Sequence, residues 1–244
     1  MINSNKYITP KNNLSVKYVL GRILLIIYGF IRYVVFVPKT SFILGGERYS
    51  YFYHRYNMTW DNERCVELPV VRREMEKFSN ESILEVGNVL SHYFHVDHDI
   101  VDKYEIARNV INQDIIDFSV EKKYDLIVSI STIEHIGWDE SPKDVGKILV
   151  AIEKLKKLLN PNGRLLITLP IGYNKYMDAL IFDEKIHFDK MYFVARIDRE
   201  HWVEVECENI RGIEYGRPFR SANGLIFAFI YSNVSHQIDY VEKA

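Results

Sequence analysis

The chain has 244 residues, of which 48% are hydrophobic and 14% aromatic, and its formal net charge is −2 at pH 7. A chain of this size can bury a full core, and it fits one domain with an elaboration better than two equal domains. The small net charge argues against a general nucleic-acid binder, because such proteins neutralise many phosphates with a clustered excess of Lys and Arg.

The charge is unevenly distributed along the chain. The first 46 residues contain six Lys and Arg and no Asp or Glu, so they carry +6 and the remainder carries −8. The two cysteines, Cys65 and Cys207, form no C-x-x-C motif and no close pair, which argues against a disulfide framework and a structural zinc site. We therefore expect a reducing, cytoplasmic compartment.

Residues 14–37 are strongly apolar but are interrupted by Lys17, Arg22 and Arg32. The uncharged run from Ile23 to Ile31 is shorter than the roughly 20 residues that cross a bilayer, and no small-residue cleavage site of a signal peptide follows it. A helix with basic residues at its margins remains. It can pack on the protein's own body or on a second subunit, as in a homodimer, or it can lie on an anionic membrane surface as a peripheral anchor.

Residues 41–69 are rich in aromatic side chains and include Gly45-Gly46 at an expected hairpin turn. They could form a satellite of the core. They also mix flat apolar surfaces with hydrogen-bonding groups, a combination that holds sugars and other polyhydroxyl ligands. We expect a lid over an acceptor molecule here, with these substrate-binding candidates: Tyr53, Tyr56, Asn57, Asn62, Glu63 and Arg64.

From Ile83 onward, short apolar runs with polar residues at their C-terminal ends recur along the chain. Helical patterns are expected at 69–78 and 144–159, and a turn at 160–163 precedes a strand at 164–169. Beyond residue 172 we expect a loop and a helix, then two strands. This layout predicts an α/β fold: a mostly parallel sheet with helices on both faces, with a ligand along one edge. We place an N-terminal cap at 1–80, the sheet domain at 81–234 and a polar tail at 235–244.

Taken in order, ILEVG, IVDKYE, NQDI, YDLIVSISTIEHIG and NPNGRLLITLPIG resemble the successive motifs of the class I S-adenosylmethionine-dependent methyltransferases. The likeness covers about residues 80 to 232. It implies a Rossmann-like sheet of seven strands whose last strand is antiparallel, and S-adenosylmethionine as the cofactor.

Several residues at strand ends are candidates for binding this cofactor. Glu85 and Gly87 would place a carboxylate and bare backbone beside its aminopropyl group. Asp102 ends the next strand, where a carboxylate can accept hydrogen bonds from ribose hydroxyls. By the family resemblance, Asp114 would accept from the adenine amino group with Ile115 against the ring. Ser131 and Thr132 end the strand that would face the methyl donor.

The glycine loop departs from the family's E-x-G-x-G-x-G pattern, because the chain reads Glu85-Val86-Gly87-Asn88-Val89-Leu90-Ser91. Asn88 adopts positive φ more readily than most residues and is expected to keep the loop turned. Val89 and Ser91 add bulk where the methionine moiety would lie. The missing glycines also argue against a nicotinamide dinucleotide.

Methyl transfer to a hydroxyl needs a group that takes the proton, and histidine is the usual choice. The candidates are His135 after the fourth strand, His187 beyond the fifth and His54 in the aromatic segment. The run SHYFHVDHD contains metal-ligand residue types, but a solvated acidic face is the simpler interpretation, and no metal is expected.

The sequence therefore predicts a methyltransferase that acts on a small or glycan-like acceptor, at oxygen, in glycan or glycolipid assembly near the inner membrane surface. Two alternatives stay open. One is a non-catalytic module that keeps the sheet for binding or assembly; the other is a protein methyltransferase.

Overall fold

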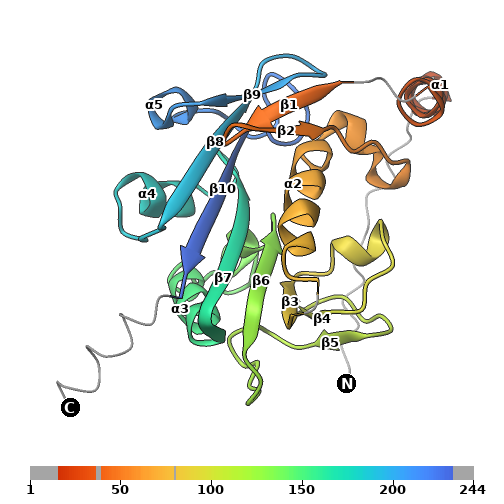
Figure 1. The fold of residues 1–244 in the computed structure, drawn as a ribbon. Helices are drawn as coiled ribbons and strands as arrows, with labels where there is room; N and C mark the ends of the chain where they lie inside the picture. Colours follow the sequence, from red (N-terminus) through yellow and green to blue (C-terminus); the bar gives the residue numbers. More distant parts are fainter. Residues whose placement is uncertain (1–15, 37–39, 80, 233–244) are drawn as a thin grey trace, which may run out of the picture.

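An eight-stranded sheet forms the centre of the computed structural model, which describes residues 16–36, 40–79 and 81–232 (Figure 1). Its strand order is β5-β4-β3-β6-β7-β10-β8-β9. The bounds in chain order are β3 Ile83–Val86, β4 Asp99–Asp102, β5 Val110–Asn112, β6 Tyr124–Ile130, β7 Leu159–Pro170, β8 Lys190–Arg196, β9 Trp202–Val205 and β10 Gly224–Tyr231. The expected polar tail at 235–244 lies outside the described residues.

The strands from β5 to β7 are parallel to their neighbours, and β10 runs antiparallel between β7 and β8. The Rossmann-like fold with an antiparallel last strand is therefore confirmed. The sheet has eight strands rather than seven, because β9 adds an antiparallel edge to β8.

The sequence misplaced two features of this half of the sheet. The helix expected before residue 200 is the short α4 (Lys175–Phe182), and residues 190–196 form a strand. The last two predicted strands do not pair with each other, since β8 lies between β9 and β10. The reason is burial: β10 reads GLIFAFIY and is buried along nearly its whole length, which is typical of a central strand and not of an edge hairpin.

Helices and a hairpin cover the two faces of the sheet. One face packs against α3 (Lys147–Lys157) and α4, and the other against α2 (Arg64–Glu76) and the hairpin of β1 (Ser41–Leu44) and β2 (Glu47–Ser50) (Figure 1). Gly45 and Gly46 form the hairpin turn that the sequence predicted, and their φ angles are +60° and +80°. Helix α2 begins five residues before Pro69, so Glu63 precedes a helix and Arg64 belongs to it.

Shorter elements complete the chain. They are α1 (Val16–Gly29), the π-helix η1 (Phe30–Val35), the 3-10 segments η2 (Tyr56–Asp61), η3 (Leu90–His92) and η4 (Ile133–His135), and α5 (Cys207–Ile210). In the part of the chain that the structure describes, no helix combines the length and the apolar composition that crossing a bilayer requires.

Helix α3 shows how the sequence pattern sets the packing. Ile148, Ala151, Ile152 and Leu155 are buried at helical spacing, whereas Val150 on the opposite side is 54% exposed. Basic residues fill the last turn, where they complement the helix dipole.

Replacing Leu155 with alanine should lower the free energy of unfolding by about 2–5 kcal/mol, because it leaves a cavity in the core. Val150→Ala on the same helix should change it by about 0.5 kcal/mol or less. Urea unfolding of both variants measures the difference. Equal costs would contradict the assignment of the buried face.

Candidate functional site

A cavity of about 620 Å³ opens at the carboxyl ends of β3 and β4, where the chain order reverses between β3 and β6. This is the place where open α/β sheets bind their ligands. Six of the predicted site residues line it: Gly87, Asp102, Asp114, Ile115, Thr132 and His135. Its volume is in the range of small-molecule sites.

The loop after β3 is held by Glu85 rather than by a run of glycines. The Glu85 side chain is fully buried, and its Oε1 accepts hydrogen bonds from the backbone N–H groups of Val89 and Leu90, both at 2.8 Å. Its Oε2 lies 2.8 Å from Nε2 of His98. Glu85 therefore lies behind the loop and not among the cavity-lining residues, in contrast to its expected place beside a ligand ammonium.

Gly87 makes the turn itself, with φ of +87°. A Cβ on Gly87 would come within 2.6 Å of Cγ2 of Thr132 and would also overlap its Oγ1. Asn88 does not adopt positive φ as predicted; it acts through hydrogen bonds. Its N–H donates to Oδ2 of Asp102 at 2.9 Å, and its side-chain amide donates to Oε1 of Glu105 at 2.8 Å.

Asp102 shapes the next turn while lining the cavity. Its Oδ1 accepts from the N–H groups of Tyr104 and Glu105, both at 2.8 Å, and its Oδ2 accepts from Asn88. The carboxylate thus ties the β3 loop to the β4 loop. A ligand hydroxyl would share these oxygens with backbone donors.

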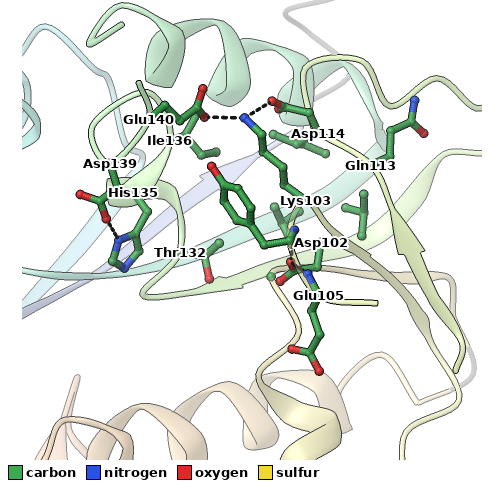
Figure 2. A pocket seen from close by; sticks show the side chains of 15 residues that line it. Asp102, Lys103, Glu105, Gln113, Asp114, Thr132, His135, Ile136, Asp139 and Glu140 are labelled. Atoms are coloured by element: carbon green, nitrogen blue, oxygen red, sulfur yellow. Dashed lines mark hydrogen bonds and ion pairs between the residues drawn. The ribbon is translucent and has the colours of Figure 1, made fainter. Parts of the chain in front are cut away.

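Asp114 and Glu140 form a network with two lysines, of which Figure 2 shows Lys103 between the two carboxylates. Nζ of Lys103 is 2.9 Å from both Asp114 Oδ2 and Glu140 Oε1, and Nζ of Lys147 is 2.7 Å from both Asp114 Oδ2 and Glu140 Oε2. Burial raises the pKa of Asp114, but hydrogen bonds from Lys147 and Lys103 outweigh it and bring the pKa to about 2. The sequence analysis did not predict this network. The sequence feature that could have indicated it is Lys103, which directly follows the candidate ligand Asp102.

His135 lines the cavity and is oriented by a carboxylate. Its Nδ1 lies 2.5 Å from Oδ2 of Asp139, which also accepts a 2.7 Å hydrogen bond from the hydroxyl of Tyr173. The Tyr173 ring packs edge-on against the imidazole, with 4.7 Å between centroids. Burial raises the pKa of Asp139, and the hydrogen bonds from His135 and Tyr173 more than offset this, so the pKa is lowered.

The turn that carries His135 has a strained backbone. Ser131, a non-glycine residue, has φ of +40° where β6 leads into η4. Such backbone strain persists only where surrounding contacts fix it, and it concentrates at functional sites. Ser131 lies outside the cavity lining; its hydroxyl donates to Oε1 of Glu67 at 2.5 Å.

The expected acceptor-binding residues divide into two groups. The side chains of Asn62 and Glu63 are buried, and that of Arg64 is nearly buried. Arg64 forms an ion pair with Glu67. Oε2 of Glu63 accepts a hydrogen bond from the N–H of Ala222 at 3.0 Å. The Asn62 side-chain amide donates to the carbonyl of Asn57 at 2.7 Å.

The second group lies farther out. The Tyr53 hydroxyl is 3.1 Å from Oγ1 of Thr40, while Tyr56 is 46% exposed and stacks on His92 at 4.8 Å. Asn57 has φ of +54° within the kinked η2. None of the expected acceptor-binding residues lines the cavity.

The other two candidate bases also lie away from the cavity. His54 accepts a hydrogen bond at Nδ1 from the N–H of Tyr56 and stacks on Phe52, and burial lowers its pKa. His187 is 86% exposed, with its nearest carboxylate at Asp189.

Within residues 16–36, 40–79 and 81–232, no three His, Cys, Asp or Glu side chains gather as a metal site would require.

No protein-family model and no curated protein matches this chain. Among solved structures it is similar to TehB from Haemophilus influenzae, with a TM-score of 0.40 and 13% identity over 73% of this chain and 64% of that one. It is also similar to the N-methyltransferase NodS from Bradyrhizobium japonicum WM9 in complex with S-adenosyl-L-homocysteine, with a TM-score of 0.39 and 13% identity over 71% of this chain and 94% of that one.

A third similar structure is the sugar N-methyltransferase KedS8 from Streptoalloteichus, with a TM-score of 0.32 and 18% identity over 53% of this chain and 54% of that one. Likenesses at this level assign no reaction to the chain. Its fold class rests on its own strand order, and its function must be argued from the cavity.

Gly46 and Gly87, which have similar φ angles, offer a test of the β3 loop. Gly46→Ala should cost about 1 kcal/mol, because Gly46 has φ of +80° and open space around its Cα. Gly87→Ala should cost about 2 kcal/mol more, because its Cβ also meets Thr132. Urea unfolding measures both.

Combining Gly87→Ala with Thr132→Gly should recover most of the extra cost in a double-mutant cycle, because the Thr132 Cβ itself lies only 2.9 Å from the added Cβ. Equal destabilisation by Gly46→Ala and Gly87→Ala, or no coupling to Thr132, would contradict the close packing of this loop.

Proposed function

We propose that the protein is an S-adenosylmethionine-dependent methyltransferase that acts on a hydroxyl of a small or glycan-like acceptor. The observation that carries the proposal is the cavity at the switch point, where Asp102 and Asp114 from successive strand ends face a histidine with a carboxylate behind it. The non-catalytic alternative needs no oriented base at this position.

The residues of the cavity fit an adenosyl ligand. Asp102 offers carboxylate oxygens at the end of β4, and the bare backbone of Gly87 forms part of the wall. Ile115 supplies an apolar surface beside Asp114. Lys103 and Lys147 both lie against Oδ2 of Asp114, so one of them must move aside for an adenine amino group to reach that oxygen.

When bound, S-adenosylmethionine supplies an electrophilic methyl group. His135 would take the proton of the attacking hydroxyl. Its Nδ1 is engaged with Asp139, which assigns the Nδ1–H tautomer and leaves Nε2 to accept the proton. Asp139, itself held by Tyr173, orients the ring and stabilises the imidazolium that forms.

We further propose that the N-terminal helix attaches the protein to an anionic membrane surface, close to a lipid-linked acceptor. Residues 23–28 of α1 are apolar and exposed at every successive position, so they face all directions around the helix. The absence of acidic residues from the first 46 positions suits anionic headgroups.

The π-helix η1, which directly follows α1, contacts the protein body beside the expected lid. Tyr33 stacks on Trp60 at 6.0 Å and donates its hydroxyl to Oε1 of Glu200 at 2.6 Å, and Arg32 pairs with the same carboxylate at 2.8 Å. A membrane-bound helix would therefore hold residues 53–64 near the lipid surface. This arrangement supports an acceptor presented by the membrane.

His135→Ala should lower kcat for methyl transfer by about 100- to 10,000-fold, because the acceptor proton loses its base. The affinity for S-adenosylhomocysteine, measured by calorimetry, should stay within about twofold. His187→Gln serves as the control, since that side chain is 86% exposed and distant from the cavity lining. No heat of binding in a folded wild-type sample would favour the non-catalytic alternative.

The full-length chain should sediment with vesicles that contain phosphatidylglycerol. The double change Leu24→Glu and Leu25→Glu should weaken this binding by about a hundredfold, because both side chains, 66% and 65% exposed, lose their apolar transfer energy. Ile106→Glu is the matched control, an exposed apolar residue in a loop of the sheet domain. Wild-type protein that stays in the supernatant would contradict the membrane attachment.

A further inference from the structure

Lys103 occupies part of the cavity that would hold the cofactor. Its Nζ lies 2.9 Å from Oδ2 of Asp114 and 2.9 Å from Oε1 of Glu140, and all three residues line the cavity. Figure 2 shows the ammonium group between the two carboxylates. A positively charged side chain of the protein therefore stands where a donor group of a ligand would meet Asp114.

Both oxygens of Asp114 already accept hydrogen bonds. Oδ2 accepts from Lys103 and from Lys147, whose Nζ is 2.7 Å away, and Oδ1 accepts from the N–H of Ile116 at 3.1 Å. A pKa of about 2 keeps the Asp114 carboxyl group ionised, so it accepts hydrogen bonds and donates none. A ligand amino group can therefore bind Oδ2 only in exchange for one of the lysines.

The protein holds the two lysines to different degrees. Lys147 is the first residue of α3, and its side chain is 18% exposed. Lys103 begins the segment 103–109, which contains no helix, strand or buried residue, and its side chain is 33% exposed. A lysine ammonium is strongly hydrated and is carried on a flexible stem of four carbons. Lys103 is therefore the lysine that moves aside.

The departure of Lys103 leaves a free acceptor behind. Lys147 still lies 2.7 Å from Oδ2 of Asp114 and 2.7 Å from Oε2 of Glu140, so each carboxylate keeps one cation. Oδ2 regains a lone pair for an N–H of the ligand. Ion pairs that solvent reaches contribute little net free energy, so a hydrogen bond from the ligand can take the place of the Lys103 contact.

We propose that Lys103 is a tethered competitor that stands where the exocyclic amino group of the cofactor's adenine ring binds, and that it lowers the selectivity of the site for that group. The proposal rests on the methyltransferase function and adds a specificity-determining residue to it. A ring with an oxygen in place of the amino group has no N–H to offer Asp114. That oxygen accepts the third N–H of Lys103 instead, and the lysine stays in place.

The test compares two ligands that differ at this one position, S-adenosylhomocysteine and its oxo analogue S-inosylhomocysteine, by calorimetry on the full-length chain. The wild-type protein should bind them with affinities within about threefold of each other. Lys103→Met keeps a stem of similar length and removes the ammonium group. This variant should bind S-adenosylhomocysteine about tenfold more tightly and S-inosylhomocysteine about tenfold more weakly. A merely structural role of Lys103 would change both affinities in the same direction.

Lys122→Met is the matched control. Lys122 also pairs with a carboxylate, that of Asp99 at 2.7 Å, but it lies outside the cavity lining. The control should leave both affinities within about twofold of the wild type. If Lys103→Met bound S-adenosylhomocysteine no more tightly than the wild type, or if both ligands shifted together, the competitor would be overturned.

The outcomes separate this inference from the function on which it rests. Binding of S-adenosylhomocysteine by the wild type with no gain in Lys103→Met retains the cofactor and overturns the competitor, whereas binding by the variant alone supports the competitor. Binding by neither protein overturns both. A melting temperature close to that of the wild type shows that Lys103→Met is folded. If it does not fold, the wild-type protein decides, because a preference for S-adenosylhomocysteine beyond about tenfold overturns the inference.

Discussion

The buried carboxylate of Glu67 is the interaction on which the arrangement of the site depends. From α2 it pairs with Arg64 through Oε2, and its Oε1 accepts hydrogen bonds from Ser131 at the end of β6 and from Thr168 in β7 at 2.6 Å. Removing one member of such a group leaves an uncompensated buried charge, at a cost of about 3–5 kcal/mol. These bonds fix α2 against the carboxyl ends of β6 and β7, and β6 leads directly into the turn that carries Glu134 and His135.

Buried carboxylates that accept hydrogen bonds also explain how the β3 loop keeps its shape with a single glycine, Gly87, at its turn. Glu85 and Asp102 each accept hydrogen bonds from backbone N–H groups on the loops beside the cavity, and Asn88 links the two loops. Carboxylates that accept several backbone hydrogen bonds hold a turn firmly. The bulk of Val89 therefore does not open the loop, because Glu85 fixes the backbone of Val89 directly.

Charge is distributed across the site in two different ways. The Lys103, Lys147, Asp114 and Glu140 network balances its charges within the protein, so a ligand must displace one of them to bind there. Glu134, in contrast, is buried without a hydrogen-bond partner among the described residues, and burial raises the pKa of its carboxyl group.

The sequence by itself determined the parallel sheet, the strand ends that hold Asp102, Asp114 and His135, and the hairpin at Gly45-Gly46, because hydrophobic periodicity and turn residues act locally. Only the tertiary structure decided that β10 inserts between β7 and β8, that Glu85 turns inward to hold backbone, and that Glu134 is left without a partner. Those outcomes depend on which distant segments meet: Glu67 and Thr168 are far apart in the chain, and no local pattern encodes the charge balance of the site they build.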